Sequence, residues 1–186
     1  MVLFVILIFC ALIALGFGGA AAWSDYTRMT IPNLYALSIL LAFVPAYGLI
    51  YYLAPEFLYF STWQSHLGAL ALVFAVTYVL FLLKVIGGGD AKLLSAYALW
   101  VGMEGLMPLV FFMAAVGGVL GIITLMLGKY KPVKKPRSSS WVGKAQREEK
   151  VVPYGIAIFV GAIIAFWQVG YLQPEILISL ATTTIG

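Results

Sequence analysis

Long apolar runs alternate with short polar segments along almost the whole chain. Six of these runs are predicted to form helices, at about 1–23, 31–53, 67–86, 90–102, 106–127 and 153–171. Most of them approach the roughly 20 residues that a helix needs to cross a bilayer. The fourth run is much shorter, so we expect that helix to pack inside the protein or to begin below the membrane surface. The pattern predicts an all-α polytopic membrane protein with about six transmembrane helices in one domain, residues 1–186.

The composition indicates the same class. Hydrophobic residues make up 63% of the 186 residues, charged residues only 10%, and the mean hydropathy is +1.05. Soluble domains are about half apolar and a quarter charged. Six crossings leave no length for a separate soluble domain. The first run has features of a signal peptide, but it lacks a basic start and is long enough to span, so we expect it to be retained.

Basic residues lie on one side of the predicted membrane. All eleven lysines and arginines follow the first, third and fifth predicted crossings or lie at their ends. The opposite loops hold only acidic charges, at Glu56, Glu104 and Glu175. Because cytoplasmic loops carry the excess of Lys and Arg, we predict a multi-pass protein of the inner (cytoplasmic) membrane with both termini outside.

Residues 128–152 form the one markedly polar segment. It carries eight basic residues against two acidic ones, together with two prolines and three consecutive serines. That composition predicts a mobile basic loop on the cytoplasmic side. We expect this loop to orient the protein in the membrane and to contact anionic lipids. Nucleic-acid binding would need a folded platform, which the sequence does not indicate.

Two acids, Asp25 and Asp90, lie at the boundaries of apolar runs on the same predicted side. A charge at membrane depth is costly and is usually functional. The glycines at 87–89 let the backbone turn sharply before Asp90 and allow another helix to approach. Two carboxylates in a poorly solvated site cannot both be ionised cheaply, so the pair is expected to share a proton. The ionised member can deprotonate a water while the protonated member polarises an amide carbonyl.

These patterns alone leave three functions open. Besides a protease, acids beside glycine-broken helices are typical of ion-coupled transporters, and a structural subunit of a membrane complex is a third interpretation. A divalent-metal site would need clustered acids, whereas each segment here offers only one. The single Cys10 and the single His66 exclude an intrachain disulfide and a Cys/His zinc site; we expect His66 to be solvated or interfacial. Lys92, two residues after Asp90, should point elsewhere and extend toward the surface.

Three short motifs carry a family resemblance. The segment Gly87-Gly88-Gly89-Asp90-Ala91-Lys92-Leu93 resembles the Gly-x-Gly-Asp-x-Lys-Leu motif of prepilin peptidases, the membrane aspartic proteases of type IV pilin systems. Asp25, followed six residues later by Ile31-Pro32-Asn33, resembles the first motif of that family. Pro153-Tyr154-Gly155 resembles a third element, which opens the final helix. Their order and the helix layout extend the resemblance over nearly the whole chain.

The resemblance implies an endopeptidase that removes a short basic leader from a pilin-like or preflagellin-like precursor. Cleavage is expected at the cytoplasmic membrane face, after a glycine and before the hydrophobic helix of the substrate, without a cofactor or a metal. Asp25 and Asp90 are the implied catalytic pair. The residues expected to shape the site are Ile31, Pro32, Asn33, Gly87, Gly89, Lys92, Pro153, Tyr154 and Gly155.

The chain departs from the longer members of the family. Those members carry a cytosolic insert with two Cys-x-x-Cys pairs, and they also methylate the new N-terminus of the product. With one cysteine and no room for that insert, the chain is similar to the short members of tight-adherence pilus systems and to archaeal preflagellin peptidases. We therefore expect no methyltransferase activity. Presenilin-like proteases share Gly-x-Gly-Asp but also carry a Pro-Ala-Leu element, which is absent here.

Overall fold

The computed structural model describes residues 2–53, 62–149, 151–173 and 175, and every regular element within them is helical. The helices are α1 (Val2–Arg28), α2 (Asn33–Leu53), α3 (Trp63–Leu82), α4 (Gly88–Tyr130), α5 (Trp141–Gln146) and α6 (Tyr154–Val169). The prediction of an all-α fold is confirmed for this part of the chain. The loop with Glu56 and nearly all of the tail after Leu172 lie outside the described residues.

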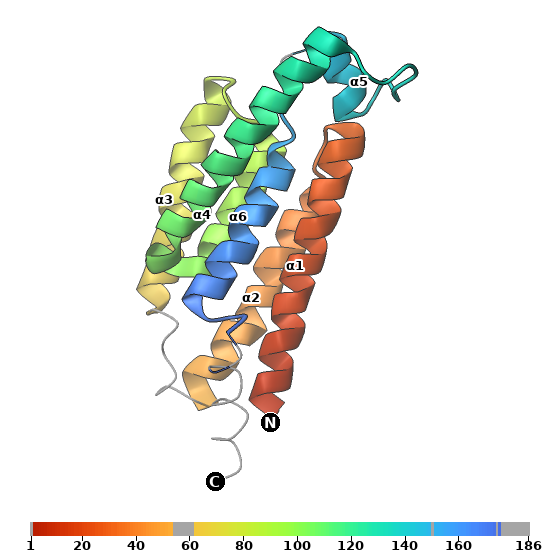
Figure 1. Ribbon diagram of the computed structural model, residues 1–186. Helices are drawn as coiled ribbons and strands as arrows, with labels where there is room; N and C mark the ends of the chain where they lie inside the picture. The colour runs from red at the N-terminus through yellow and green to blue at the C-terminus, as the bar shows by residue number, and fades with distance from the viewer. Residues whose placement is uncertain (1, 54–61, 150, 174, 176–186) are drawn as a thin grey trace.

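Three of the described helices are long and apolar enough to cross a membrane, judged by length and composition: α1 from Val5, α3 and α4. α6 and the stretch Asn33–Leu49 of α2 are also apolar but shorter. α4 consists of two arms that meet at Gly102, and Figure 1 shows the chain reversing direction between them. Counting both arms of α4, the described residues form six apolar helical segments, as many as the apolar runs predicted from the sequence.

The break in α4 depends on a glycine. Gly102 has φ 63° and ψ −174°, a left-handed backbone that side chains with a β-carbon rarely adopt. The second arm begins directly after it, where the backbone N–H of Met103 donates to Oγ of Ser65 at 2.9 Å. That contact supplies a partner for one of the N–H groups that a helix start leaves unsatisfied. The short fourth helix predicted from the sequence is thus the first arm of α4.

The first arm of α4 is the centre of the bundle, and its residues 93–102 are all buried. Its polar ring atoms bond carbonyl groups of the surrounding helices: the Tyr97 hydroxyl donates to Ala14 of α1, and Trp100 Nε1 donates to Ile39 of α2. Such bonds are favoured where the alternative is an unpaired polar group in hydrocarbon. The expectation that this helix packs inside the protein is confirmed.

Two local predictions are wrong. The first helix does not end near residue 23 but continues to Arg28, and within this last part the Thr27 hydroxyl donates to the carbonyl of Trp23. His66 is neither solvated nor interfacial: it is 1% exposed, with Nδ1 2.7 Å from the carbonyl oxygen of Leu99. α3 begins four residues earlier than the predicted apolar run, and this places His66 inside the bundle.

The basic segment is also more ordered than its composition indicates. It contains α5, whose N-cap Ser140 accepts a hydrogen bond from the N–H of Gly143. Trp141, the first residue of α5, is 6% exposed. The prediction of a mobile loop is therefore wrong for residues 137–147. Figure 1 shows α5 at the upper end of the bundle, beside the end of α1 and away from the chain start.

Candidate active site

Asp25 and Asp90 line the same cavity. Asp25 lies in the last turn of α1 and is 5% exposed, and Asp90 lies in the first turn of α4. The cavity has a volume of about 290 Å³, and the two carboxyl groups are close enough to interact electrostatically. Its walls are formed by Asp25, Met29, Thr30, Ile31, Gly87, Gly88, Gly89 and Asp90. The structure thus brings together the two acids that the charge distribution placed on one side.

Asp25 is oriented by the start of α6. The backbone N–H of Gly155 donates to Asp25 Oδ2 at 2.8 Å. Gly155 is the second residue of α6, whose N-cap Pro153 makes no side-chain capping bond. The carboxyl group of Asp25 therefore caps α6 from another helix, where the helix dipole also favours negative charge. A β-carbon at Gly155 would lie 3.0 Å from Asp25 Oδ2, so a side chain there would press against the carboxyl group.

Asp90 is oriented by its own helix start. The carboxyl group of Asp90 lies close to the backbone of Gly87, the N-cap of α4. Asp90 is the third residue of α4, the position from which an acidic side chain can reach back toward the N-cap backbone. The φ of Gly87 is −73°, which any residue can adopt, so the backbone conformation does not call for glycine. The reason for a glycine here is the lack of room for a side chain. A β-carbon there would lie 2.8 Å from Asp90 Oδ2.

The turn between α1 and α2 forms the remaining wall. Met29 ends α1 with φ 53°, and the Ser24 hydroxyl donates to the carbonyl of Thr30 at 2.8 Å. Ile31 lies between two glycines: a β-carbon at Gly89 would be 2.9 Å from Ile31 Cβ, and one at Gly155 would be 3.1 Å from Ile31 Cδ1. Three chain segments therefore meet around the cavity with little space to spare.

Comparison with known protein families matches residues 1–122 to the type IV leader peptidase family. The match covers about two thirds of the chain and includes both acids. The chain belongs to the type IV leader peptidase family. It is accordingly a peptidase of the leader-removing class and a membrane protein, whose relatives act on pilin-like precursors. No match is found among curated proteins or among solved structures.

The leader peptidase carries Asn33 and Lys92 outside the cavity, on the exposed rim. Lys92 Nζ donates to Asn33 Oδ1 at 2.8 Å, which ties the first turn of α4 to the start of α2. Lys92 extends to the surface as predicted, but the sequence did not indicate its bond to Asn33. Pro32 is exposed and immediately precedes α2, and it does not line the cavity.

The third motif of the leader peptidase lies beyond the residues that match the family, and its members have different surroundings. Gly155 contacts Asp25 directly, and Pro153 is buried as the N-cap of α6. Tyr154 instead packs toward Gly117 of α4, where a β-carbon would lie 3.2 Å from its ring. Of the three, the structure places only Gly155 in contact with an acid of the cavity.

Several residues of the site were not predicted from the sequence. Met29, Thr30 and Gly88 line the cavity, and buried Ser24 holds its turn. Ser24 could have been predicted, because it is the neighbour of Asp25 in the sequence. A buried polar side chain usually forms a hydrogen bond with a nearby backbone group. Met29 could not have been predicted from the sequence. It contributes to the turn through its positive φ, and methionine is not a residue type that favours such a conformation.

Proposed function

We propose that this leader peptidase is an aspartic endopeptidase in which Asp25 and Asp90 act on one water molecule. The observation that carries the proposal is that both carboxyl groups line one cavity and interact electrostatically. The ionised carboxylate takes a proton from the water, and the water oxygen attacks the scissile carbonyl carbon. The protonated carboxyl group donates to the carbonyl oxygen. Collapse of the tetrahedral intermediate releases the new amine, which receives a proton from the pair.

The proposed substrate is a type IV pilin-like precursor with a short basic leader, cut at the cytoplasmic membrane face. The position of the cavity supports this substrate. It lies at the end of the bundle that carries the basic residues, next to the turn between α1 and α2 and the start of α4. A precursor whose apolar helix lies in the bilayer and whose leader lies in the cytosol presents its scissile bond at that depth. The positive-inside rule assigns the same end to the cytoplasm.

Co-expression with a pilin-like precursor tests the proposal. The precursor carries a basic leader, a glycine and then a long apolar helix, and cleavage is read as a mobility shift. Mass spectrometry of the product locates the cut, which should follow the glycine, and reports whether the new N-terminus is methylated; we expect that it is not. Asp25→Asn and Asp90→Asn should each lower kcat/KM by about 10³-fold or more, because members of a catalytic pair act as a unit.

Glu104→Gln is the matched control. Glu104 lies at the opposite end of the bundle, accepts a hydrogen bond from Ser65, and should tolerate the change with cleavage at the wild-type rate. All three variants should insert into the membrane in wild-type amounts. Cleavage that persists in either Asp variant would contradict the paired mechanism. Ion flux in proteoliposomes without proteolysis would favour a transporter instead.

A further inference from the structure

The basic segment is held against the last turn of α1. The Trp141 ring meets the Tyr26 ring edge-on, with centroids 6.1 Å apart, and Trp141 Nε1 donates to Thr124 Oγ1 of α4 at 2.9 Å. The Ser139 hydroxyl donates to the carbonyl oxygen of Thr27 at 3.4 Å. A buried tryptophan with its N–H paired is a strong anchor. These contacts give the surface between the segment and α1 a defined shape.

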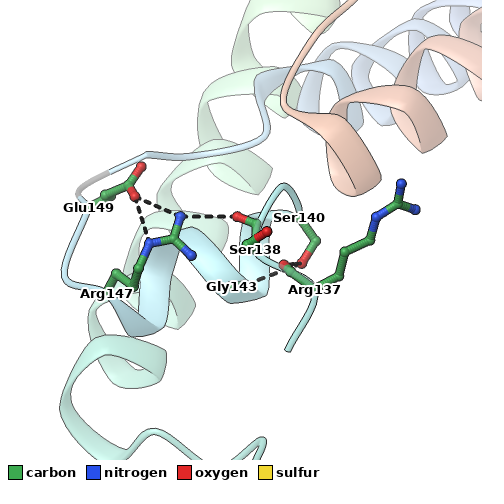
Figure 2. Close-up of polar contacts among 6 residues, drawn as sticks. All are labelled: Arg137, Ser138, Ser140, Gly143, Arg147 and Glu149. Carbon is green, nitrogen blue, oxygen red and sulfur yellow. Dashed lines mark hydrogen bonds and ion pairs between the residues drawn. The ribbon is translucent and has the colours of Figure 1, made fainter. Parts of the chain in front are cut away.

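A cavity of about 370 Å³ lies between the segment and α1, and we call it the basic cavity. It is bordered by Tyr26 and Thr27 of α1 and by Lys135, Arg137, Ser140 and Val142 of the segment. Both basic side chains are exposed, and none of the described residues that line the cavity is acidic. Within the described part of the chain, neither Lys135 nor Arg137 uses its side chain in a hydrogen bond or an ion pair. Figure 2 shows the Arg137 side chain extending away from Glu149, which pairs instead with Arg147 at 2.8 Å.

A second cavity, of about 360 Å³, adjoins the basic cavity at Tyr26, which borders both. Its other lining residues are Gly19, Ala22 and Trp23 of α1 and Ile156 of α6, and we call it the apolar cavity. The four lining residues of α1 follow one another at the three- and four-residue spacing of a single helix face. The two cavities therefore form one continuous surface with a cationic part and an apolar part.

The cationic and apolar parts lie at different depths of the membrane. α1 is long and apolar enough to span the bilayer up to Arg28, so Thr27 and the basic cavity lie where this helix leaves the membrane. From Thr27 to Gly19 the helix axis covers about 12 Å, which carries the apolar cavity toward the acyl chains. Trp23 is 68% exposed, and its ring centroid lies 5.9 Å from that of Tyr26. Exposed Trp and Tyr residues are typical of the headgroup level.

We propose that the basic and apolar cavities together bind one anionic phospholipid, with its phosphate between Lys135 and Arg137 and an acyl chain in the apolar cavity. Two cations without an acidic partner, directly beside an apolar surface, complement a phosphate that carries a hydrocarbon chain. The guanidinium group of Arg137 is able to bind two phosphate oxygens at once, and Lys135 adds a point charge. The basic leader of the proposed substrate would be repelled by the same two cations. The lipid contact expected of the whole segment 128–152 is thereby assigned to two of its eight basic residues.

A lipid titration of the full chain in detergent, read by native mass spectrometry, tests the cationic part of the site. Phosphatidylglycerol and phosphatidylcholine with the same acyl chains are compared, and one phosphatidylglycerol should bind in preference. Lys135→Gln combined with Arg137→Gln should weaken its binding by roughly 20-fold, about fivefold for each charge lost, and leave phosphatidylcholine binding unchanged. Lys129→Gln combined with Lys134→Gln is the matched control, because both lysines are exposed in the same segment and neither lines the basic cavity. Equal losses in the two double variants would show a general attraction to the segment and overturn the site.

Gly19→Leu tests the apolar part of the site. A β-carbon at Gly19 meets the Phe159 ring at an ordinary contact distance of 3.5 Å, so leucine should fit there and fill the apolar cavity. The affinity for phosphatidylglycerol should fall severalfold, because the acyl chain loses its contact surface. Gly16→Leu, at an open position one turn earlier, is the control and should bind the lipid like the wild type.

Two further outcomes would assign the cavities to other ligands and overturn the proposal. Displacement of the lipid by excess glycerol 3-phosphate, with wild-type binding by Gly19→Leu, would indicate a site for a soluble phosphate. A higher KM for leader cleavage in the Lys135 and Arg137 double variant, with lipid binding unchanged, would indicate a substrate contact. Thermal unfolding identifies a misfolded variant, and the single variants Lys135→Gln and Arg137→Gln then replace the double variant in the same titration. Because the titration requires no cleavage, its result is independent of the proposed function.

Discussion

The backbone N–H of Gly155 donates to Asp25 Oδ2 at 2.8 Å, although 130 residues separate donor and acceptor. The bond joins the first helix of the chain to the last described one. It also means that the residues matching the family, 1–122, do not complete the surroundings of their own acid. The start of α6 must be in place before Asp25 is oriented. The integrity of this junction is therefore expected to govern both activity and stability.

A side chain at Gly155 should disrupt the site. Gly155→Ala places a β-carbon 3.0 Å from Asp25 Oδ2 and 3.1 Å from Ile31 Cδ1, and Gly155→Val adds two methyl groups to the same space. We expect a loss of about 1–3 kcal/mol of stability for the alanine variant. Leader cleavage should fall severalfold for alanine and to background for valine. Thermal unfolding and the cleavage assay measure the two effects separately.

Gly121→Ala is the control for this pair, because a β-carbon there meets nothing within 4 Å. It should cleave like the wild type. Wild-type cleavage by Gly155→Val would show that the observed contact between α6 and Asp25 is not needed for activity.

Gly89 separates Asp90 from the turn that precedes α2. A β-carbon at Gly89 would lie 2.9 Å from Ile31 Cβ and 3.2 Å from the Ile31 carbonyl oxygen, and that backbone cannot give way easily. Gly89→Ala should therefore move the start of α4 and Asp90 with it. We expect kcat/KM to drop at least tenfold, since small displacements of a catalytic group are costly. Gly16→Ala, at an open position in α1, should cleave normally; equal rates for both variants would contradict the tight junction.

The helix layout and the pairing of the acids were predictable because they leave a signal along the chain. Apolar runs of membrane length mark the helices, and the distribution of Lys and Arg places Asp25 and Asp90 on one side. Even the short fourth helix is visible, since the run ends at Gly102. These features are properties of whole segments, so errors of a few residues at the helix ends do not disturb them.

The ordered basic segment was not predictable in the same way. Prolines, serines and lysines are typical of a loop, and the composition of 128–152 contains nothing that contradicts this. What orders the segment is contact with distant residues: Trp141 packs against Tyr26 and bonds Thr124. The same reason explains His66, which is buried because α2 and the first arm of α4 surround it. Contacts between residues far apart in sequence do not produce a periodic pattern of apolar and polar residues from which they could be predicted.

The reversal of the chain in α4 should depend on Gly102. Its φ of 63° with ψ −174° is a backbone conformation that is essentially restricted to glycine, and it should cost a residue with a β-carbon roughly 1–3 kcal/mol. Gly102→Ala should lower the thermal unfolding midpoint in detergent, and Gly102→Val should lower it further. Gly118→Ala, at an open position in the second arm, controls for the loss of a glycine and should not destabilise. A Gly102→Ala midpoint equal to the wild-type value would contradict the strained conformation.

The bond between Lys92 and Asn33 is expected to couple two motifs that are 59 residues apart. Both side chains are exposed to solvent, so the bond should be worth only about 0.5–1 kcal/mol, less than the roughly 1.5–3 kcal/mol of hydrogen bonds with a charged partner in general. A double-mutant cycle measures it: Lys92→Ala and Asn33→Ala should each lower kcat/KM, and the double variant should lose less than the product of the two effects. The coupling corresponds to a factor of about 2–5 in rate.

The matched cycle uses Lys131 and Glu148, an exposed pair 3.0 Å apart in the basic segment. It removes a contact of similar length and exposure that borders neither acid, and it should leave kcat/KM unchanged in all three variants. Independent, multiplicative effects of Lys92→Ala and Asn33→Ala would mean that each residue acts alone. Coupling in the first cycle but not in the second would show that the bond between Lys92 and Asn33 holds the start of α4, with Asp90, against α2. A general loss of surface contacts would instead affect both cycles equally.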